Sequence, residues 1–181
     1  MKLWLVRHAQ PLVEAGICYG ANNIAADPIA TRTAAQSLAN TLPPGVAVIS
    51  STLQRCEQLA QHLRGLRPDL AYEQDARLQE MDFGQWEGQR WDAIPRTELD
   101  AWTAGFDAWR CGGAESVADV MRRVGAVWDE TLARQQSAVW ITHAGVIRAA
   151  TLLAQGVRHI HRADQWPAHA PAFGQWQLAD I

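Results

Sequence analysis

Residues 3–11, LWLVRHAQP, decide the fold of this chain. Leu3 to Val6 is an unbroken apolar run, which is typical of a strand buried on both faces of a sheet. The run leads directly into Arg7 and His8 and stops at Pro11, which cannot donate to a sheet ladder. We therefore expect a fixed cation and a titratable imidazole at the carboxyl end of a core strand, where open α/β sheets bind their ligands.

Residues 138–145, AVWITHAG, repeat this design in the second half of the chain. An apolar run is again followed by a histidine, His143, and then by Gly145 at the start of a helical pattern. Two buried strands that each carry a histidine to the same edge of a sheet predict one site that contains both His8 and His143.

The rest of the chain alternates short apolar runs with helical periodicity. The predicted elements are a helix at about 28–42, a strand at 46–49, a helix from about 51, a weak strand at 70–73, a helix from 115–116 to 132, a helix at 146–155 and a last strand within 173–178. This alternation predicts an α/β fold: a three-layer α/β/α sandwich with a mostly parallel central sheet and helices on both faces.

Bulk properties narrow the class of protein. The length of 181 residues predicts a single domain over 1–181. A net charge of −3 gives no reason to expect nucleic acid or a membrane as partner, and no apolar run approaches the roughly 20 residues of a membrane span. Three cysteines without a CxxC pair and a strand that begins beside Met1, leaving no room for a signal peptide, predict a reduced, cytoplasmic protein.

Several common hydrolase sites are absent from the sequence. There is no Gly-x-Ser-x-Gly elbow and no glycine-rich phosphate loop ending in Lys-Ser or Lys-Thr. A cysteine phosphatase needs an arginine six residues after its cysteine, but those positions hold Ile24, His62 and Val117. His159 and His161 could be half of a metal site, but they lack a spaced companion pair, so we expect no metal and no cofactor.

The two histidine segments resemble those of the histidine phosphatase superfamily, the phosphoglycerate-mutase-like fold. Residues 51–60 resemble its second arginine segment, and residues 78–88 resemble its acid segment. The four segments occur in the family's order and extend over nearly the whole chain. The resemblance implies that this chain is a metal-independent phosphatase.

By this resemblance His8 is the nucleophile and forms a phosphohistidine, because neutral imidazole is a good nucleophile near pH 7. Glu80 is the implied general acid that protonates the leaving oxygen, and later the base that activates water. The alternative for Glu80 is a loop carboxylate that faces the solvent.

The resemblance also implies a phosphate-binding set. Arg7 and Arg55 supply forked cationic donors, and His143 and Ala144 supply further contacts to the phosphate. Ser51 and Gln54 have the spacing of a capping box, so we expect the helix to begin near Ser51 and its N-terminus to face the phosphate.

Two positions depart from the family pattern. Ala9 replaces the usual glycine after the nucleophile, and Glu14 replaces an asparagine that many members have. A carboxylate at position 14 would repel phosphate if it lay in the site. Asn22 or Asn23 could supply the missing contact instead.

The substrate is predicted less directly. Residues 16–20 resemble the α-ribazole-phosphate phosphatase branch, which acts in cobalamin synthesis, and the short chain favours hydrolysis over mutase activity. The alternatives are a phosphoglycerate mutase or sugar-phosphate phosphatase of the same superfamily, and a phosphate-binding relative without turnover. In each case the binding partner is a small phosphomonoester substrate. The oligomeric state is left open between a monomer and a homodimer.

Two loops, 12–27 and 82–109, are expected to overhang the phosphate. They contribute many aromatic residues and few cations, which suits a flat, neutral substrate body that stacks. The aromatic residues in question are Tyr19, Phe83, Trp86, Trp91, Trp102, Phe106 and Trp109. The alternative is that they are ordinary core.

Overall fold

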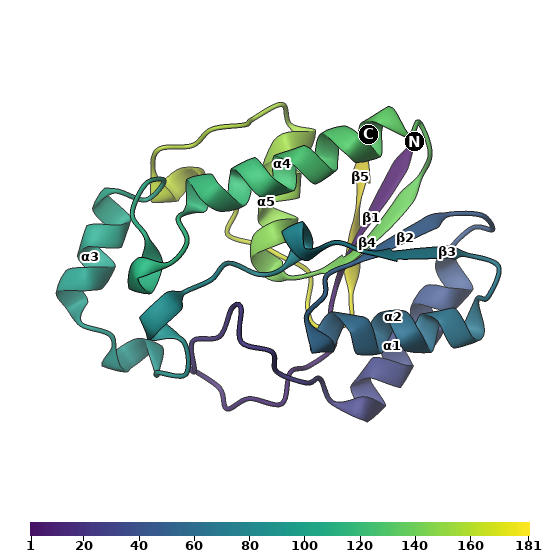
Figure 1. Ribbon diagram of the computed structural model, residues 1–181, viewed down its shortest axis with the longest axis horizontal. Coiled ribbons are helices and arrows are strands. Elements are labelled where there is room, and N and C mark those ends of the chain that lie inside the picture. The colour runs from purple at the N-terminus through teal and green to yellow at the C-terminus, as the bar shows by residue number, and fades with distance from the viewer.

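The computed structural model describes all of residues 1–181 and contains one five-stranded sheet between two layers of helices (Figure 1). The strands are β1 (Lys2–Arg7), β2 (Ala47–Ser50), β3 (Ala71–Gln74), β4 (Ala138–Thr142) and β5 (Trp176–Asp180). The helices are α1 (Pro28–Thr41), α2 (Gln54–Leu66), α3 (Arg96–Ala104), α4 (Val117–Ala133) and α5 (Ala144–Ala154). The strand order is β3-β2-β4-β1-β5, parallel except for β5, which runs antiparallel to β1. The predicted fold class is confirmed.

The apolar run of β1 is explained by burial on both faces. Leu3 and Leu5 point into a core cluster shared with α4 and α5, whereas Trp4 and Val6 point into a second cluster shared with α1 and α2. Figure 1 shows the two helix pairs on opposite sides of the strands. Since alternate side chains of a strand face opposite ways, a strand between two helix layers needs apolar residues at every position.

Local sequence determines where two of the helices begin. The Asp27 carboxylate accepts a hydrogen bond from Ala30 N at 2.7 Å, and Pro28 occupies the first turn of α1, where a missing N–H costs nothing. Ser116 and Asp119 form a reciprocal capping box at the start of α4. The amphipathic helix predicted from residue 116 onward is therefore confirmed.

The capping box predicted at Ser51 and Gln54 is wrong. The helix α2 begins only at Gln54, and the cap position, Leu53, has no side-chain hydrogen bond. The Asn23 side chain, from a loop 31 residues away in sequence, accepts the hydrogen bond of Gln54 N at 2.7 Å. Ser51 Oγ instead accepts from Leu53 N at 3.3 Å and makes a further contact, described below.

The sheet order places β1 and β4 side by side at a topological switch point. The helix that follows β1 lies on one face of the sheet and the helix that follows β4 lies on the other, so the chain diverges there and opens a crevice. Arg7 is in register with Thr142, and His8 N donates to Thr142 O at 3.0 Å. The two histidines therefore emerge next to each other.

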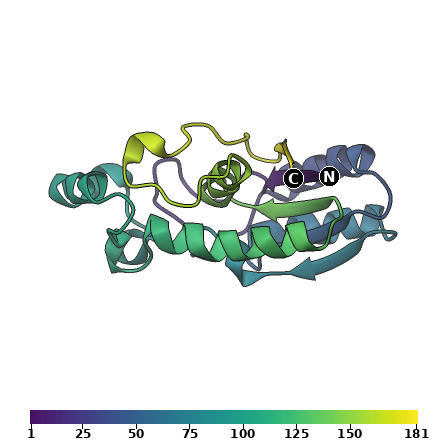
Figure 2. The same cartoon turned by 90° about the horizontal axis from the view of Figure 1, so that it is seen from above.

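Segment 75–116 extends away from the sheet and carries α3 at one end of the elongated molecule (Figure 2). No helix combines the length and the apolar character that crossing a bilayer would need.

Candidate active site

His8 lies at the end of β1 and is almost completely buried. Its Nδ1 is 2.7 Å from the carbonyl oxygen of Ala9. A carbonyl can only accept, so Nδ1 carries the proton and Nε2 keeps its lone pair. Burial, together with the charge of Arg55, lowers the pKa of His8 to about 3. The ring is therefore neutral at physiological pH, with an unprotonated Nε2.

His143 is fully buried beside His8, with ring centroids 5.1 Å apart. Arg55 Nε donates to His143 Nδ1 at 3.2 Å, and a guanidinium cannot accept, so the ring proton is on Nε2. Nε2 lies 2.9 Å from Ser51 Oγ and donates a hydrogen bond to it. Burial is the main reason that the pKa of His143 lies well below its ordinary value. In this arrangement its one N–H is used by Ser51.

Arg55 comes from the first turn of α2 and is fully buried. Its Nη2 donates to Gly20 O at 2.6 Å and its Nη1 donates to Asn22 O at 2.8 Å. Both carbonyls belong to the loop that follows the nucleophile. The guanidinium is thus held in one orientation, and each terminal nitrogen retains a second N–H.

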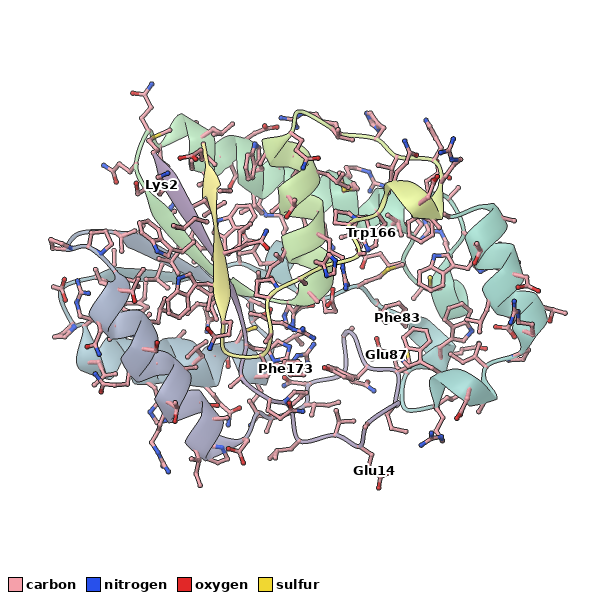
Figure 3. The ribbon with its side chains drawn as sticks, turned by 180° about the vertical axis from the view of Figure 1, so that it is seen from behind. Lys2, Glu14, Phe83, Glu87, Trp166 and Phe173 are labelled. Carbon is pink, nitrogen blue, oxygen red and sulfur yellow. The ribbon has the colours of Figure 1, made fainter.

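Arg7 is held less completely. Its Nη1 donates to Pro171 O at 3.0 Å, and the guanidinium carbon lies 3.9 Å from the centre of the Phe173 ring. Its Nε is buried without a hydrogen-bond partner. Phe173 also packs 5.5 Å from the His8 ring and, in Figure 3, points from the C-terminal segment toward the end of the sheet. A guanidinium held by one carbonyl and one aromatic ring keeps N–H groups on its terminal nitrogens for a ligand.

Neither Arg7 nor Arg55 is neutralised by a carboxylate. Ten of the other arginines form ion pairs with Asp or Glu, and these two do not. Two unpaired guanidiniums beside a neutral imidazole make a site suited to a phosphate group.

Glu80 faces inward rather than toward the solvent. Its Oε2 accepts from Gly145 N and its Oε1 from Met81 N, both at 3.0 Å. A Cβ on Gly145 would lie only 2.3 Å from Glu80 Oε1, so glycine is required for this approach. Arg123 donates at 2.6 Å to the carbonyl of Gln79 and thereby holds the segment that carries Glu80.

Ala144 is the first residue of α5, with His143 at the cap position. Its backbone N–H therefore has no partner within the helix and lies at the positive end of the helix dipole. The structure thus gathers His8, His143, Arg7, Arg55 and this helix terminus at one edge of the sheet, with Glu80 against the same helix.

The family model of the histidine phosphatase superfamily (branch 1) matches residues 3–170. This chain belongs to the histidine phosphatase superfamily. Membership supports a phosphatase. No curated protein sequence matches the chain.

Solved structures with the same fold share little sequence with this histidine phosphatase. TTHB049 from Thermus thermophilus is 25% identical with a TM-score of 0.75, and the match covers 99% of this chain and 94% of that one. Mycobacterial glucosyl-3-phosphoglycerate phosphatase is 22% identical with a TM-score of 0.80, covering 98% and 88%. A protein described as mycobacterial hydrolase 1 is 22% identical with a TM-score of 0.81, covering 98% and 87%.

Sequence reasoning missed Glu87 as a part of this site. Its carboxylate accepts from Ala21 N and Asn22 N, both at 2.7 Å, and from Phe83 N at 3.0 Å. It therefore joins the loop whose carbonyls hold Arg55 to the segment that carries Glu80, as Figure 3 shows for Glu87 and Phe83. The only sequence signal is its place in the acid segment, which does not indicate a partner 65 residues earlier.

Gly20 makes this junction sterically feasible. A Cβ at that position would lie 1.9 Å from Met81 O, so the two loops approach closely only because the residue is glycine.

Other residues considered from the sequence lie elsewhere. Glu14 is exposed and points away from the site (Figure 3), so its carboxylate does not face the phosphate-binding groups. Asn23 uses its side-chain oxygen to cap α2. His161 pairs with Asp107 at 3.0 Å, and no three His, Cys, Asp or Glu side chains of the structure form a group that could hold a metal ion.

The expected aromatic rim is only partly present. Trp86 and Phe106 are buried in the main core, so these two are ordinary core residues. Phe83, Trp91 and Trp102 are only partly buried against that core. These aromatic side chains pack on one another and extend the main core into the segment that lies beyond the sheet.

Proposed function

We propose that this chain is a metal-independent phosphomonoesterase that works through a phosphohistidine on His8. The observation that carries the proposal is the tautomer of His8: Nδ1–H is tied to the Ala9 carbonyl, which leaves Nε2 as a nucleophile between two unpaired arginines. This is the state that nucleophilic attack needs.

In the first step His8 Nε2 attacks phosphorus and the bond from phosphorus to the leaving oxygen breaks. Arg7, Arg55 and the Ala144 N–H stabilise the charge on the transferring phosphoryl oxygens. Glu80 gives its proton to the leaving oxygen and becomes a carboxylate. The products of this step are phosphohistidine and a free alcohol.

In the second step Glu80 takes a proton from water while the water oxygen attacks the phosphohistidine. The bond from Nε2 to phosphorus breaks, His8 recovers its lone pair and inorganic phosphate leaves. Glu80 is again protonated. The cycle needs no metal, because arginines supply the positive charge that magnesium supplies in other phosphoryl-transfer sites.

The test is to trap the intermediate. Wild-type protein quenched during turnover of ³²P-labelled substrate should carry acid-labile, base-stable phosphate, and His8→Ala should carry none and show no turnover. Full activity in His8→Ala would refute the mechanism. Phosphate binding without turnover by the wild type would instead support a non-catalytic relative.

We further propose that the substrate is α-ribazole 5′-phosphate. Besides the resemblance of residues 16–20, support comes from a cavity of about 210 Å³ beside Glu80 that Phe83, Trp91 and Trp102 help to line. The leaving alcohol must lie next to the general acid, so this cavity is close to where its body would go.

A second candidate is hydrolysis of a phosphorylated glycerate or sugar. The name of the mycobacterial glucosyl-3-phosphoglycerate phosphatase, which shares the fold, supports it. A panel containing α-ribazole 5′-phosphate, 3-phosphoglycerate and fructose bisphosphate separates the two: the first proposal requires the highest kcat/KM for the ribazole compound.

A further inference from the structure

Glu80 separates two hollows in the surface. One, the aromatic cavity, has a volume of about 210 Å³ and is lined by Phe83, Trp91, Trp102 and Trp166, together with Glu80 and Arg148. The other has a volume of about 510 Å³ and a mostly polar and charged lining. A leaving group whose oxygen lies at Glu80 must extend into one of them.

The cations that line this second hollow are already paired with carboxylates. Arg110 and Arg122 both pair with Asp119, and Arg123 pairs with Glu115 at 2.7 Å. Each of the three cations in this lining thus has a carboxylate within ion-pair distance. A substrate that bound there would have to compete with these pairs.

Arg148, in the aromatic cavity, is different. It forms no ion pair, and its one hydrogen bond is a 3.3 Å contact from Nη2 to Ala168 O. Its Nε is buried without a partner. Trp102 Nε1, on another residue of the same cavity, is also buried without a partner. The terminal nitrogens of the Arg148 guanidinium therefore keep N–H groups that no carboxylate and only one carbonyl engages, and these can donate to an acceptor held in the cavity.

The shape and lining of the cavity restrict the ligand further. Phe83 contacts Trp91 edge to face with centroids 5.3 Å apart, so the wall presents both ring edges and ring faces, and Trp166 lines the same cavity. The volume is below the roughly 300–1,000 Å³ of pockets for drug-sized ligands, so it suits a single ring system. A guanidinium both stacks on planar rings and donates to acceptors in their plane.

We infer that the aromatic cavity is the leaving-group subsite and that Arg148 determines its specificity, selecting alcohols that carry a planar heteroaromatic ring with a hydrogen-bond acceptor. This inference rests on the proposed phosphomonoesterase function and adds the subsite that holds the leaving group and the residue that recognises it.

The test uses substrates whose leaving alcohols share the ribose 5′-hydroxyl. These are ribose 5-phosphate, indole riboside 5′-phosphate and benzimidazole riboside 5′-phosphate; only the last two carry an aromatic ring, and only the last has an acceptor nitrogen in that ring. We expect kcat/KM to rise along this series, with the acceptor contributing roughly tenfold, as a hydrogen bond to a charged donor does. Equal kcat/KM values along the series would overturn the inference.

The variant Arg148→Met removes the donor that would bind the acceptor nitrogen of the ring. It should bring kcat/KM for the benzimidazole compound down to that for the indole compound, and Arg148→Lys should restore part of the difference. Arg32→Met is the matched control, since Arg32 also lacks an ion pair but lies exposed on α1, and it should leave the ratio unchanged. An unchanged ratio in Arg148→Met would refute the role of Arg148.

Binding of the dephosphorylated benzimidazole riboside, followed by tryptophan fluorescence, separates this inference from the proposed function. If no phosphomonoester is hydrolysed, including p-nitrophenyl phosphate, the proposed function fails, yet riboside binding that weakens in Arg148→Met would still support the subsite. If p-nitrophenyl phosphate is hydrolysed and the riboside does not bind, only the subsite fails.

Discussion

The inner part of the site and the aromatic cavity are built in different ways. Around His8, His143 and Arg55, the ring nitrogens of His143 and all three guanidinium nitrogens of Arg55 have partners, and the three residues are buried at strand ends or in the first turn of a helix. Around the cavity, the lining is mainly aromatic, its arginine, Arg148, has no carboxylate partner, and part of the wall comes from loops.

This difference assigns the two regions different tasks. A buried cluster whose side chains are held by several hydrogen bonds keeps its geometry before a ligand arrives, as phosphoryl transfer requires. A cavity lined by aromatic rings and by a guanidinium without a carboxylate can discriminate between ligands, so it is suited to selecting substrates. The reaction should therefore depend on the inner cluster, and the choice of substrate should depend on the cavity.

The largest effect after loss of His8 is expected for Glu80→Gln. The amide has nearly the same size but cannot give up a proton, so kcat should fall by roughly 10²–10⁴-fold for alkyl phosphates. The fall should be smaller for p-nitrophenyl phosphate, whose leaving group needs less protonation. Equal falls for both substrates would show that Glu80 positions the substrate and does not transfer a proton.

The buried histidines predict a steep loss of stability in acid. The pKa of His8 is lowered from 6.5 to about 3, so below pH 6.5 the unfolded chain takes up a proton that the native chain excludes. The free energy of unfolding should consequently decrease as pH falls from 6.5 toward 3, with about 1.4 kcal/mol per pH unit from His8 and a further decrease from His143, whose pKa is also lowered. Urea denaturation at pH 6, 5 and 4 measures this slope.

His8→Gln should flatten that slope, because glutamine does not titrate. The same slope in wild type and variant would mean that the native His8 is already protonated in this range.

A smaller effect is expected for Glu87→Gln, which tests how the two loops are joined. The amide can replace only one carboxylate oxygen and turns an NH₂ group toward backbone donors. This should lower the free energy of unfolding by about 1–3 kcal/mol. Because these loops hold Arg55 and Glu80, KM should rise about tenfold and p-nitrophenyl phosphate turnover should fall less than in Glu80→Gln. Glu14→Gln, an exposed carboxylate of the same loop, is the control and should change neither quantity.

The smallest effect concerns metals. Incubation with EDTA should leave the rate of p-nitrophenyl phosphate hydrolysis unchanged, since arginines provide the positive charge of the site. Loss of activity restored by one added divalent cation would require a metal in the mechanism.

Prediction from the sequence succeeded for features that a single short stretch of residues determines. Residues 3–6 and 138–141 are apolar at every position, which only a strand between two helix layers requires, and the histidines after them follow from chain continuity. It failed at Ser51, where a local capping pattern was overridden by Asn23, and it left open whether Trp86 is rim or core, because the burial of Trp86 depends on packing of segment 75–116.

The sequence by itself thus determined the α/β fold, the edge of the sheet at which the site forms and the family. Periodicity and strand ends are local properties of the chain, and they carry this information directly. Only the tertiary structure decided the protonated nitrogen of His8, the engagement of His143 by Ser51 and Arg55, the part played by Glu87 and the unpaired state of Arg148. These properties depend on contacts between residues far apart in the chain, which no spacing in one sequence reveals.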